Sequence, residues 1–185
     1  MKWSRVACVT LLAGLFCSSL ALGGVVDVSA EPASQTVAID SFFDVFVVMD
    51  APDDSIVGWG IDVWWDDAII NLVGLPEYNT PPWDEASNIF DEPGLLDLAA
   101  LTFPPGESGN DLLLVTLHFK AIAIGETDVV PSHTVGDATE GFALDYPPGG
   151  FADATYHNGH VIVTPEPTTL ALLAFGCLGL IRGRR

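Results

Sequence analysis

Apolar and polar side chains alternate with a period of two along most of the middle of this chain. In the segment 59–66, for example, Trp59, Ile61 and Val63 fall on one face. A period of two is typical of β-strands, because successive side chains of a strand point to opposite faces. No window of the middle region keeps a helical period of 3.6 over a dozen residues. The pattern therefore predicts an all-β domain.

Turn signals separate eight to ten short segments that carry this alternation. Gly, Pro, Asn and Asp gather between them, as in 51–54 and 104–106, and these residue types favour turns. The longest segment, 111–125, is predicted to turn Leu113 and Val115 inward. Short strands with such dense turns predict a single antiparallel β-sandwich. The expected strands are 25–29, 35–39, 42–49, 59–66, 69–74, 97–103, 111–125, 127–130, 142–145 and 159–163.

Acidic residues dominate the same region. Of the 25 Asp and Glu residues, 24 lie in 24–164, and of the six Lys and Arg residues only Lys120 does, so this stretch carries a formal charge of −23. Such a surface repels phosphate backbones, which excludes nucleic acid as a partner. The chain is 49% hydrophobic. That share over about 140 residues is enough to bury a core, so the acidity indicates a folded domain and not disorder.

The middle region lacks the motifs of an enzyme. It contains no Gly-x-Ser-x-Gly, no His-Glu-x-x-His and no phosphate-binding loop. All three cysteines lie in the terminal segments, so the region has no thiolate nucleophile and no disulfide. The adjacent carboxylates of Asp66 and Asp67 would point to opposite faces of a strand and could not act on one glycosidic bond. We expect a protein that is not an enzyme.

Residues 1–23 have the three parts of a secretory signal peptide. A basic start is followed by the apolar stretch 6–22 and by small residues before Gly24. We expect cleavage between Gly23 and Gly24. A second pattern of small residues ends at Ala30, but the strand expected from residue 25 favours the first position.

The last 21 residues, PEPTTLALLAFGCLGLIRGRR, combine a Pro-Glu-Pro triplet, a twelve-residue apolar run and three arginines. Twelve helical residues extend about 18 Å, whereas a bilayer core is about 30 Å thick, so the run is short for a permanent anchor. Arginines behind the run would stay in the cytoplasm and leave the acidic domain outside. The signature residues are Pro165, Glu166, Pro167, Arg182, Arg184 and Arg185.

This tail resembles the PEP-CTERM sorting signal of Gram-negative bacteria. The resemblance implies export, a transient inner-membrane anchor and processing near the motif by an enzyme of the exosortase type. It also implies delivery to the cell surface or extracellular matrix, often alongside exopolysaccharide. The membrane would be contacted only through the C-terminal segment, before processing.

The middle region resembles the cohesin family. Segment 29–75 has a Val-rich strand, a Gly-Trp pair, an alternating strand and an Asp-ended turn, while 109–129 matches a long later strand and 157–164 a closing strand. The resemblance implies a jelly roll of about nine strands. Cohesins bind dockerins and are related in fold to carbohydrate-binding modules, so the resemblance implies non-catalytic recognition but names no ligand.

Trp64 is the strongest candidate for ligand contact. Alternation turns it outward with Asp62 and Asp66 on either side. A flat aromatic ring flanked by carboxylates suits a sugar ring or a protein hot spot, although a covering loop is the alternative interpretation. Trp83 and Tyr78, in the loop that follows, are expected companions.

No metal or other cofactor is required by the sequence. Asp50, Asp53 and Asp54 are weak candidates for a structural Ca²⁺ site, but they lack the spacing of an EF-hand loop. His157 and His160 bracket an Asn-Gly pair, which is interpreted as a hairpin turn with incidental histidines.

The sequence thus predicts a signal peptide (1–23), a cohesin-like β-sandwich (24–164) and a sorting signal (165–185). The expected function is that of an exported surface or matrix protein whose β-sandwich binds carbohydrate or an extracellular protein. Two alternatives stay open: a purely structural acidic component of a matrix or biofilm, and a hydrolase that acts on polysaccharide.

Overall fold

The computed structural model describes residues 24–83, 85–137, 139–145 and 150–166, with the backbone alone for 85–91. These residues form twelve β-strands and no helix, which confirms the predicted all-β domain. The strands are β1 (Val25–Glu31), β2 (Ser34–Ala38), β3 (Phe42–Trp64), β4 (Ile70–Leu72), β5 (Glu77–Tyr78), β6 (Glu85–Glu92), β7 (Leu95–Leu101), β8 (Glu107–Ala121), β9 (Gly125–Ser132), β10 (Gly141–Leu144), β11 (Phe151–His157) and β12 (Gly159–Thr164).

Both predicted targeting segments extend beyond this part of the chain. Signal-peptide residues through Gly23 and sorting-signal residues from Pro167 onward lie outside the described residues, so they stay predictions. Within the described residues no helix is long and apolar enough to cross a membrane.

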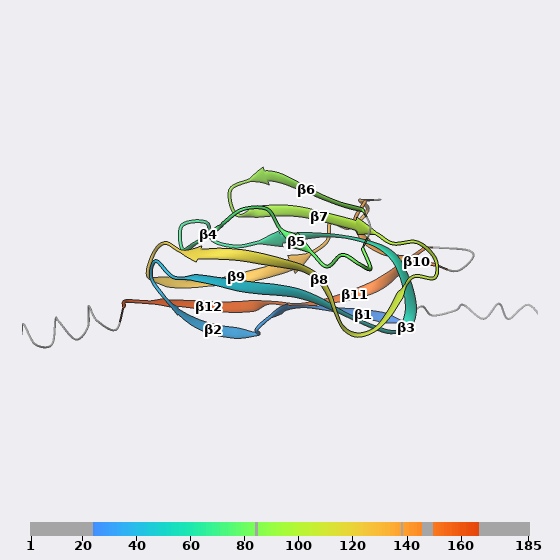
Figure 1. The fold of residues 1–185 in the computed structure, drawn as a ribbon, viewed down its shortest axis with the longest axis horizontal. Helices are drawn as coiled ribbons and strands as arrows, with labels where there is room; N and C mark the ends of the chain where they lie inside the picture. The colour runs from blue at the N-terminus through green and yellow to red at the C-terminus, as the bar shows by residue number, and fades with distance from the viewer. Residues whose placement is uncertain (1–23, 84, 138, 146–149, 167–185) are drawn as a thin grey trace, which may run out of the picture.

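Strand β3 runs through both layers of the sandwich. Its first part, 42–49, pairs with β8 and partly with β1, and its last part, 56–64, pairs with β7, β10 and β9. Between these parts the strand bends (Figure 1), and its pairing with β8 shifts register on both sides of Ala51. The turn predicted at 51–54 is therefore corrected to a bend inside one continuous strand.

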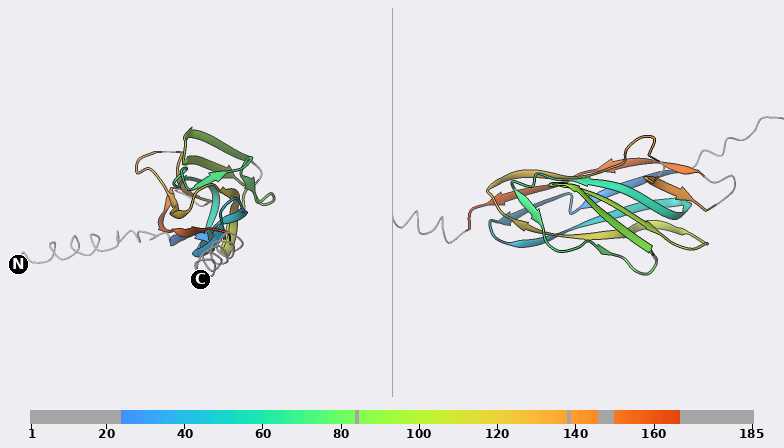
Figure 2. Two further views of the ribbon diagram at one scale, coloured as in Figure 1. Left: turned by 90° about the vertical axis from the view of Figure 1, so that its left-hand side faces the viewer. Right: turned by 90° about the horizontal axis from the view of Figure 1, so that it is seen from above.

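The two layers meet along β3. One layer contains β4, β5, β8, the first part of β3, β1 and β11, and the other contains β6, β7 and the last part of β3. Strand β9 pairs with β3 in the second layer and also with β12. Strand β10 pairs with β3 in the second layer and also with β11 of the first layer. Both strands therefore connect the layers. The strands run along the long axis (Figure 2), and the start of β1 and the end of β12 lie at opposite ends (Figure 1).

The sandwich departs from the predicted antiparallel arrangement in two pairs. Strand β1 runs parallel to β11, and β2 runs parallel to β12. Alternation within a segment carries no information on the direction of a distant partner, so this pairing was not predictable. Strands β5, β6 and β11 were also missed. In β11, Ala152 is buried and Ala154 and Tyr156 are partly buried, but two alanines give a weak hydrophobic alternation.

The longest predicted strand ends earlier than expected and contains a bulge. Strand β8 ends at Ala121, and its register against β3 shifts between Val47 and Val48. The shift inserts one residue, so that Leu114 is fully buried while the predicted Leu113 is only half-buried. Val115 faces inward as expected.

Aromatic rings from both layers fill the core. The rings of Phe119 and Phe43 lie 5.8 Å apart, and the ring of Trp65 meets the edge of Phe119 at 5.3 Å. Trp59 meets Trp83 edge-on at 6.0 Å between ring centres. Such pairs contribute to stability beyond the area they bury. The ring contacts of Phe119 therefore stabilise the first layer, and those of Trp59 stabilise the second.

We expect Phe119→Ala to lower the free energy of unfolding by about 3–5 kcal/mol, because it leaves a cavity between Phe43 and Trp65. The matched control is Phe103→Ala, since Phe103 is 72% exposed; its effect is expected to be about 0.5 kcal/mol or less. Urea unfolding of the purified protein measures both values. Similar losses in the two variants would contradict this account of the core.

Candidate binding surface

A row of apolar side chains crosses the outer face of the second layer. Cross-strand register places Leu101 of β7, Gly58 of β3, Ala143 of β10 and Phe151 of β11 next to one another in that order. Residues directly opposite in antiparallel strands point to the same face. Leu101 and Phe151 are each 53% exposed. The row therefore presents one large apolar side chain at each end, with two small residues between them.

The small residues let the large side chains lie against the sheet. A Cβ atom at Gly58 would stand 2.5 Å from Leu101 Cδ2, so the Leu101 side chain lies across this glycine. A Cβ atom at Gly141 would stand 3.0 Å from Cδ1 of Phe151, which lies across that position in the same way. The result is a shallow apolar surface.

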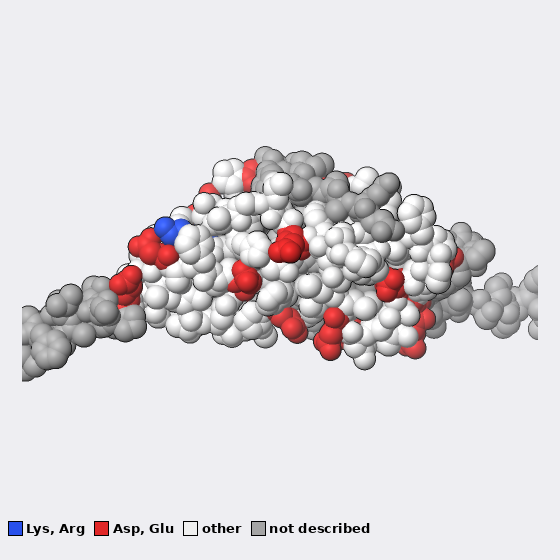
Figure 3. Space-filling view, in the orientation of Figure 1, with Lys and Arg blue, Asp and Glu red and all other residues white. Residues whose placement is uncertain are grey.

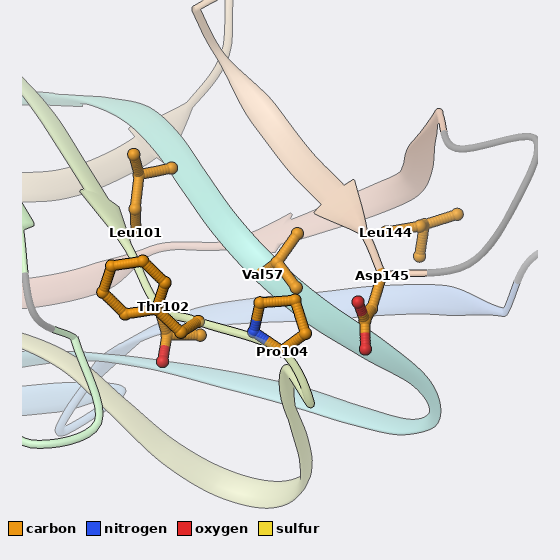
Figure 4. Close-up of a pocket in the computed structure, with 7 residues that line it drawn as sticks. Val57, Leu101, Thr102, Pro104, Leu144 and Asp145 are labelled. Carbon is orange, nitrogen blue, oxygen red and sulfur yellow. The ribbon is translucent and has the colours of Figure 1, made fainter.

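A pocket of about 430 Å³ opens beside this row, next to Leu101, Gly58 and Ala143 (Figure 4). Leu101, Phe103, Pro104 and Leu144 contribute to its apolar lining, and Asp145 contributes one carboxylate. Asp145 is held in place, because its Oδ2 accepts a hydrogen bond from the Gly106 amide at 3.3 Å. The volume falls within the range of small-molecule and side-chain pockets, about 300–1,000 Å³. The pocket can take an apolar group that carries a donor or positive charge at its edge.

Trp64 lies on the same face of β3, but well away from this row. It is 41% exposed and stands between Leu95 of β7 and Val130 of β9. Six residues along β3 separate it from Gly58, which corresponds to about 20 Å. The outward direction predicted for Trp64 matches the structure, while its ligand stays a prediction.

Asp62 is a buried group, which corrects the expectation that it flanks Trp64 on the surface. It is only 9% exposed, and its Oδ2 accepts a hydrogen bond from the Thr134 hydroxyl at 3.3 Å. The backbone after β9 folds over β3 here, so that a Cβ atom at Gly60 would stand 2.1 Å from the Thr139 carbonyl oxygen. Glu140, also buried, accepts a hydrogen bond from the Thr134 amide. This covering segment separates Trp64 from the apolar row.

Tyr156 lies close enough to this covered region to respond to its charges. Burial of the phenol, followed by the charges of Glu140 and then Asp62, raises the pKa of Tyr156 above its ordinary value. The Tyr156 ring also lies 5.4 Å from the His133 ring. The covered carboxylates of Glu140 and Asp62 therefore act on a partly buried residue of the module.

The structure does not bring Trp83 and Tyr78 to Trp64. Trp83 is fully buried, and its indole N–H donates to the Leu113 carbonyl oxygen at 3.3 Å. Tyr78 stacks on Trp59, on the inner side of β3, at 5.9 Å. Burial, and then the charge of Asp97, raises the pKa of Tyr78 above its ordinary value. Tyr78 and Trp83 stand on either side of the Asn- and Pro-containing segment 79–82, and this turn signal does not predict that the chain returns to the core.

The remaining predicted site residues are dispersed. Asp66 is exposed in a turn, where its Oδ1 accepts from the Ala68 amide at 2.9 Å. Asp50 accepts from the Asp111 amide at 2.6 Å, Asp53 is exposed and Asp54 is buried. Among the described residues, no group of three or more His, Cys, Asp and Glu side chains is arranged to hold a metal ion. A structural Ca²⁺ stays a prediction.

The outer face of the first layer carries a polar cluster that sequence reasoning missed. His118 Nδ1 lies 2.7 Å from Asp44 Oδ1, and its Nε2 lies 3.3 Å from Glu77 Oε2. Hydrogen bonding to Asp44 is the main cause that raises the pKa of His118, and Glu77 adds to it. His118 looked isolated in sequence. Only the register of β3 against β8, which places Asp44 opposite His118, would have predicted the pair.

Comparison with protein-family models and with curated proteins finds no match for this sequence. Among solved structures, the sixth cohesin from scaffoldin B of Acetivibrio cellulolyticus, solved with a Cel5 dockerin variant, is 15% identical, with a TM-score of 0.60 over 76% of this chain and 100% of that one.

Two further structures match over similar lengths. A cohesin module from a family 33 glycoside hydrolase of Clostridium perfringens is 12% identical, with a TM-score of 0.61 over 77% of this chain and 98% of that one. A non-cellulosomal cohesin from Archaeoglobus fulgidus is 9% identical, with a TM-score of 0.59 over 80% and 97%. At these identities the likeness establishes a cohesin-like fold, as the sequence resemblance implied.

The raised pKa of His118 makes part of the stability depend on pH. Since the folded value lies above the unfolded value of about 6.5, this contribution is complete below about pH 6.5 and is lost as the pH rises through the folded pKa. We expect Asp44→Asn to lower the His118 pKa, as measured by NMR titration of the ring. Asp128→Asn, whose partner is His160, is the control and should leave His118 unchanged.

Proposed function

We propose that this protein is a non-catalytic module that binds a protein partner through the Leu101 face, defined as Val57, Gly58, Leu101, Phe103, Ala143 and Phe151. The observation that carries the proposal is the exposure of Leu101, Phe103 and Phe151, at 53%, 72% and 53%, on adjoining parts of one face. Contiguous exposed apolar surface on a soluble domain is typical of interaction sites. A pocket beside it offers the recess that a hot-spot side chain occupies.

The fold supports this class of function by analogy. The Acetivibrio cellulolyticus cohesin with the same fold was solved in complex with a dockerin. Fold analogy supplies a class of partner and not its identity, because one fold hosts many functions. We therefore propose a protein partner without assigning a dockerin.

The charge of the module restricts the chemistry of that partner. Acidic side chains are spread over the face seen in Figure 3, and the stretch 24–164 carries 24 acidic residues against Lys120. Complementary charge steers association and disfavours partners of like charge. The partner is proposed to place an apolar side chain in the pocket and basic groups around it, within reach of Asp145.

The predicted export route fits this arrangement. The end of β12 leads into the predicted sorting segment, and it lies at the opposite end of the molecule from β10, beside which the pocket opens (Figure 1). While the sorting segment is held in the inner membrane, the pocket would lie toward the end of the module that is farther from it. We propose that the module is displayed on the cell surface or in the extracellular matrix.

We expect Phe103→Ala to weaken partner binding by about 30-fold or more, because a hot-spot side chain contributes about 2 kcal/mol or more. Phe42→Ala is the matched control, since Phe42 is 69% exposed and stands on β3 in the first layer, paired with Lys120 of β8. The full chain serves as bait for the extracellular fraction of the host, followed by titration of the captured protein.

The outcomes of this titration separate the candidate functions. Loss of saturable protein binding in Phe103→Ala alone supports the proposal. Recovery of polysaccharide that depends on Trp64 and not on Phe103 would replace it with the carbohydrate-binding alternative. Association that responds only to divalent cations, and that does not change when Phe103 or Trp64 is substituted, would favour a structural matrix component.

The proposed sorting is tested separately. We expect the exported protein to lack the segment after the Pro-Glu-Pro motif, as measured by intact mass. Replacing Pro165, Glu166 and Pro167 with alanine should leave the full segment attached and the protein in the membrane fraction. Release of this variant at the normal rate would contradict the assignment of the motif.

A further inference from the structure

We infer that the end of the module at which the chain leaves β12 contacts the membrane surface through an apolar tip, defined as Phe42, Ile122 and Ile124. The inference rests on the predicted insertion of the apolar run 170–181 in the inner membrane, and it is independent of the proposed protein partner. It adds a contact by the module itself to the contact predicted for the C-terminal segment.

The three side chains of the tip are large, apolar and exposed. Phe42 is 69% exposed, Ile122 is 42% exposed and Ile124 is 57% exposed. Phe42 is the first residue of β3, and both isoleucines belong to the short connection between β8 and β9. Apolar side chains that gather on the surface of a soluble domain are typical of a contact site.

Backbone hydrogen bonds join three connections at this end of the module. The Asp40 amide donates to the Ala121 carbonyl oxygen at 2.9 Å, and the Ala121 amide donates to the Ser41 carbonyl oxygen at 3.0 Å. The Ile122 amide donates to the Ile69 carbonyl oxygen, in the connection from β3 to β4, at 2.9 Å. The backbone under the tip is therefore fixed by partners from distant parts of the sequence.

The chain leaves the module beside the tip. Gly125 is paired with Val163, so continuing this antiparallel register by one residue brings Ile124 next to Thr164. The Thr164 carbonyl oxygen also accepts a hydrogen bond from the Ile39 amide at 2.8 Å, in the connection from β2 to β3. The end of β12 and the connection from β8 to β9 lie at the same end of the module (Figure 1).

The segment between the module and the apolar run is short. Residues 165–169 separate Thr164 from Leu170, and the six steps between these two residues span at most about 20 Å. The headgroup layer of one leaflet accounts for about 5–8 Å of that distance. While the run is inserted up to Leu170, the end of β12 is therefore held within about 15 Å of the membrane surface.

Tethering makes a weak contact with lipid sufficient. A short linker gives a tethered group an effective concentration on the order of 1 mM at its target. Transfer of Ile and Phe side chains from water to the membrane is favourable. The apolar run is also shorter than the hydrocarbon core, and such a mismatch is relieved by thinning of the bilayer or by snorkelling of flanking residues. Both conditions bring the tip and the bilayer together.

The charge around the tip restricts the kind of lipid. Lys120 is the only Lys or Arg of residues 24–166, and its Nζ lies 3.0 Å from Asp40 Oδ1 and 6.0 Å from the centre of the Phe42 ring. Asp66 and Asp67, in the connection from β3 to β4, leave this end with an excess of negative charge. Anionic headgroups repel such a surface. The tip therefore suits zwitterionic headgroups better than anionic ones.

The experiment places a probe on the tip of the full chain in nanodiscs of phosphatidylcholine. The three native cysteines are replaced by serine, and Ile124→Cys carries an environment-sensitive fluorophore. Phe151→Cys is the matched control, since Phe151 is 53% exposed and its strand pairs with β10, at the end opposite to that of β12 (Figure 1). Lipids with a spin label in the acyl chain should quench most of the emission at position 124 and little at position 151. Phosphatidylglycerol should weaken the quenching at position 124.

A charge on the tip should lift the module from the bilayer. With the probe at Phe42→Cys, the further change Ile124→Asp should reduce the quenching, because a carboxylate disfavours transfer to the membrane. Phe151→Asp, measured with the same probe, should leave the quenching unchanged. The probe at position 42 also replaces the one at position 124 if Ile124→Cys fails to fold.

The other outcomes overturn the inference in distinguishable ways. A chain that enters the nanodiscs but whose tip probe stays unquenched would overturn the tip contact and leave the predicted insertion standing. A chain that does not enter them would overturn both. Equal quenching at positions 124 and 151 would mean that the module lies on its side. A probe that responds to protein density, and not to spin-labelled lipid, would assign the tip to a second copy of the chain. None of these results bears on the titration of Phe103→Ala with the protein partner.

Discussion

The fold depends on the pairing of one strand with partners in two layers. Strand β3 pairs with β8 and β1 before its bend and with β7, β10 and β9 after it. Because its inward side chains, among them Val47, Trp59 and Ile61, are buried on both sides of the bend, the same strand fixes the distance between the layers. Any slip in its register would move apolar side chains to the surface in both layers at once.

The outer face of β3 is covered by a distant segment in one part and open to solvent in another. After the bend, the backbone beyond β9 lies over Gly60 and Asp62, whereas the nearest atom to a Cβ at Gly58 belongs to the Leu101 side chain on the neighbouring strand. Glycines at both positions allow close approach, in one case of a backbone and in the other of a side chain. The backbone over Gly60 covers that part of the sheet, whereas the Leu101 side chain over Gly58 leaves a flat apolar surface open to solvent.

The strand pattern and the outward direction of Trp64 could be predicted from alternation, since both are local properties. The burial of Trp83 and of Asp62 could not, because each depends on a segment distant in sequence: Leu113 accepts from Trp83, and Thr134 donates to Asp62. The Leu101 face was missed for the same reason. Its members come from β3, β7, β10, β11 and the segment after β7, and no local pattern in the sequence brings them together.

Acidity and the apolar face together limit what the module can associate with. An exposed Leu and two exposed Phe side chains would favour self-association in a neutral domain. In this module two copies that approach with these faces also bring together Asp145 and the surrounding negative charge, and like charges oppose that contact. A basic partner meets the opposite condition, because the same charge attracts it before the apolar surfaces touch. If the Leu101 face binds a partner as proposed, the excess of Asp and Glu selects against acidic partners and against a second copy of the module.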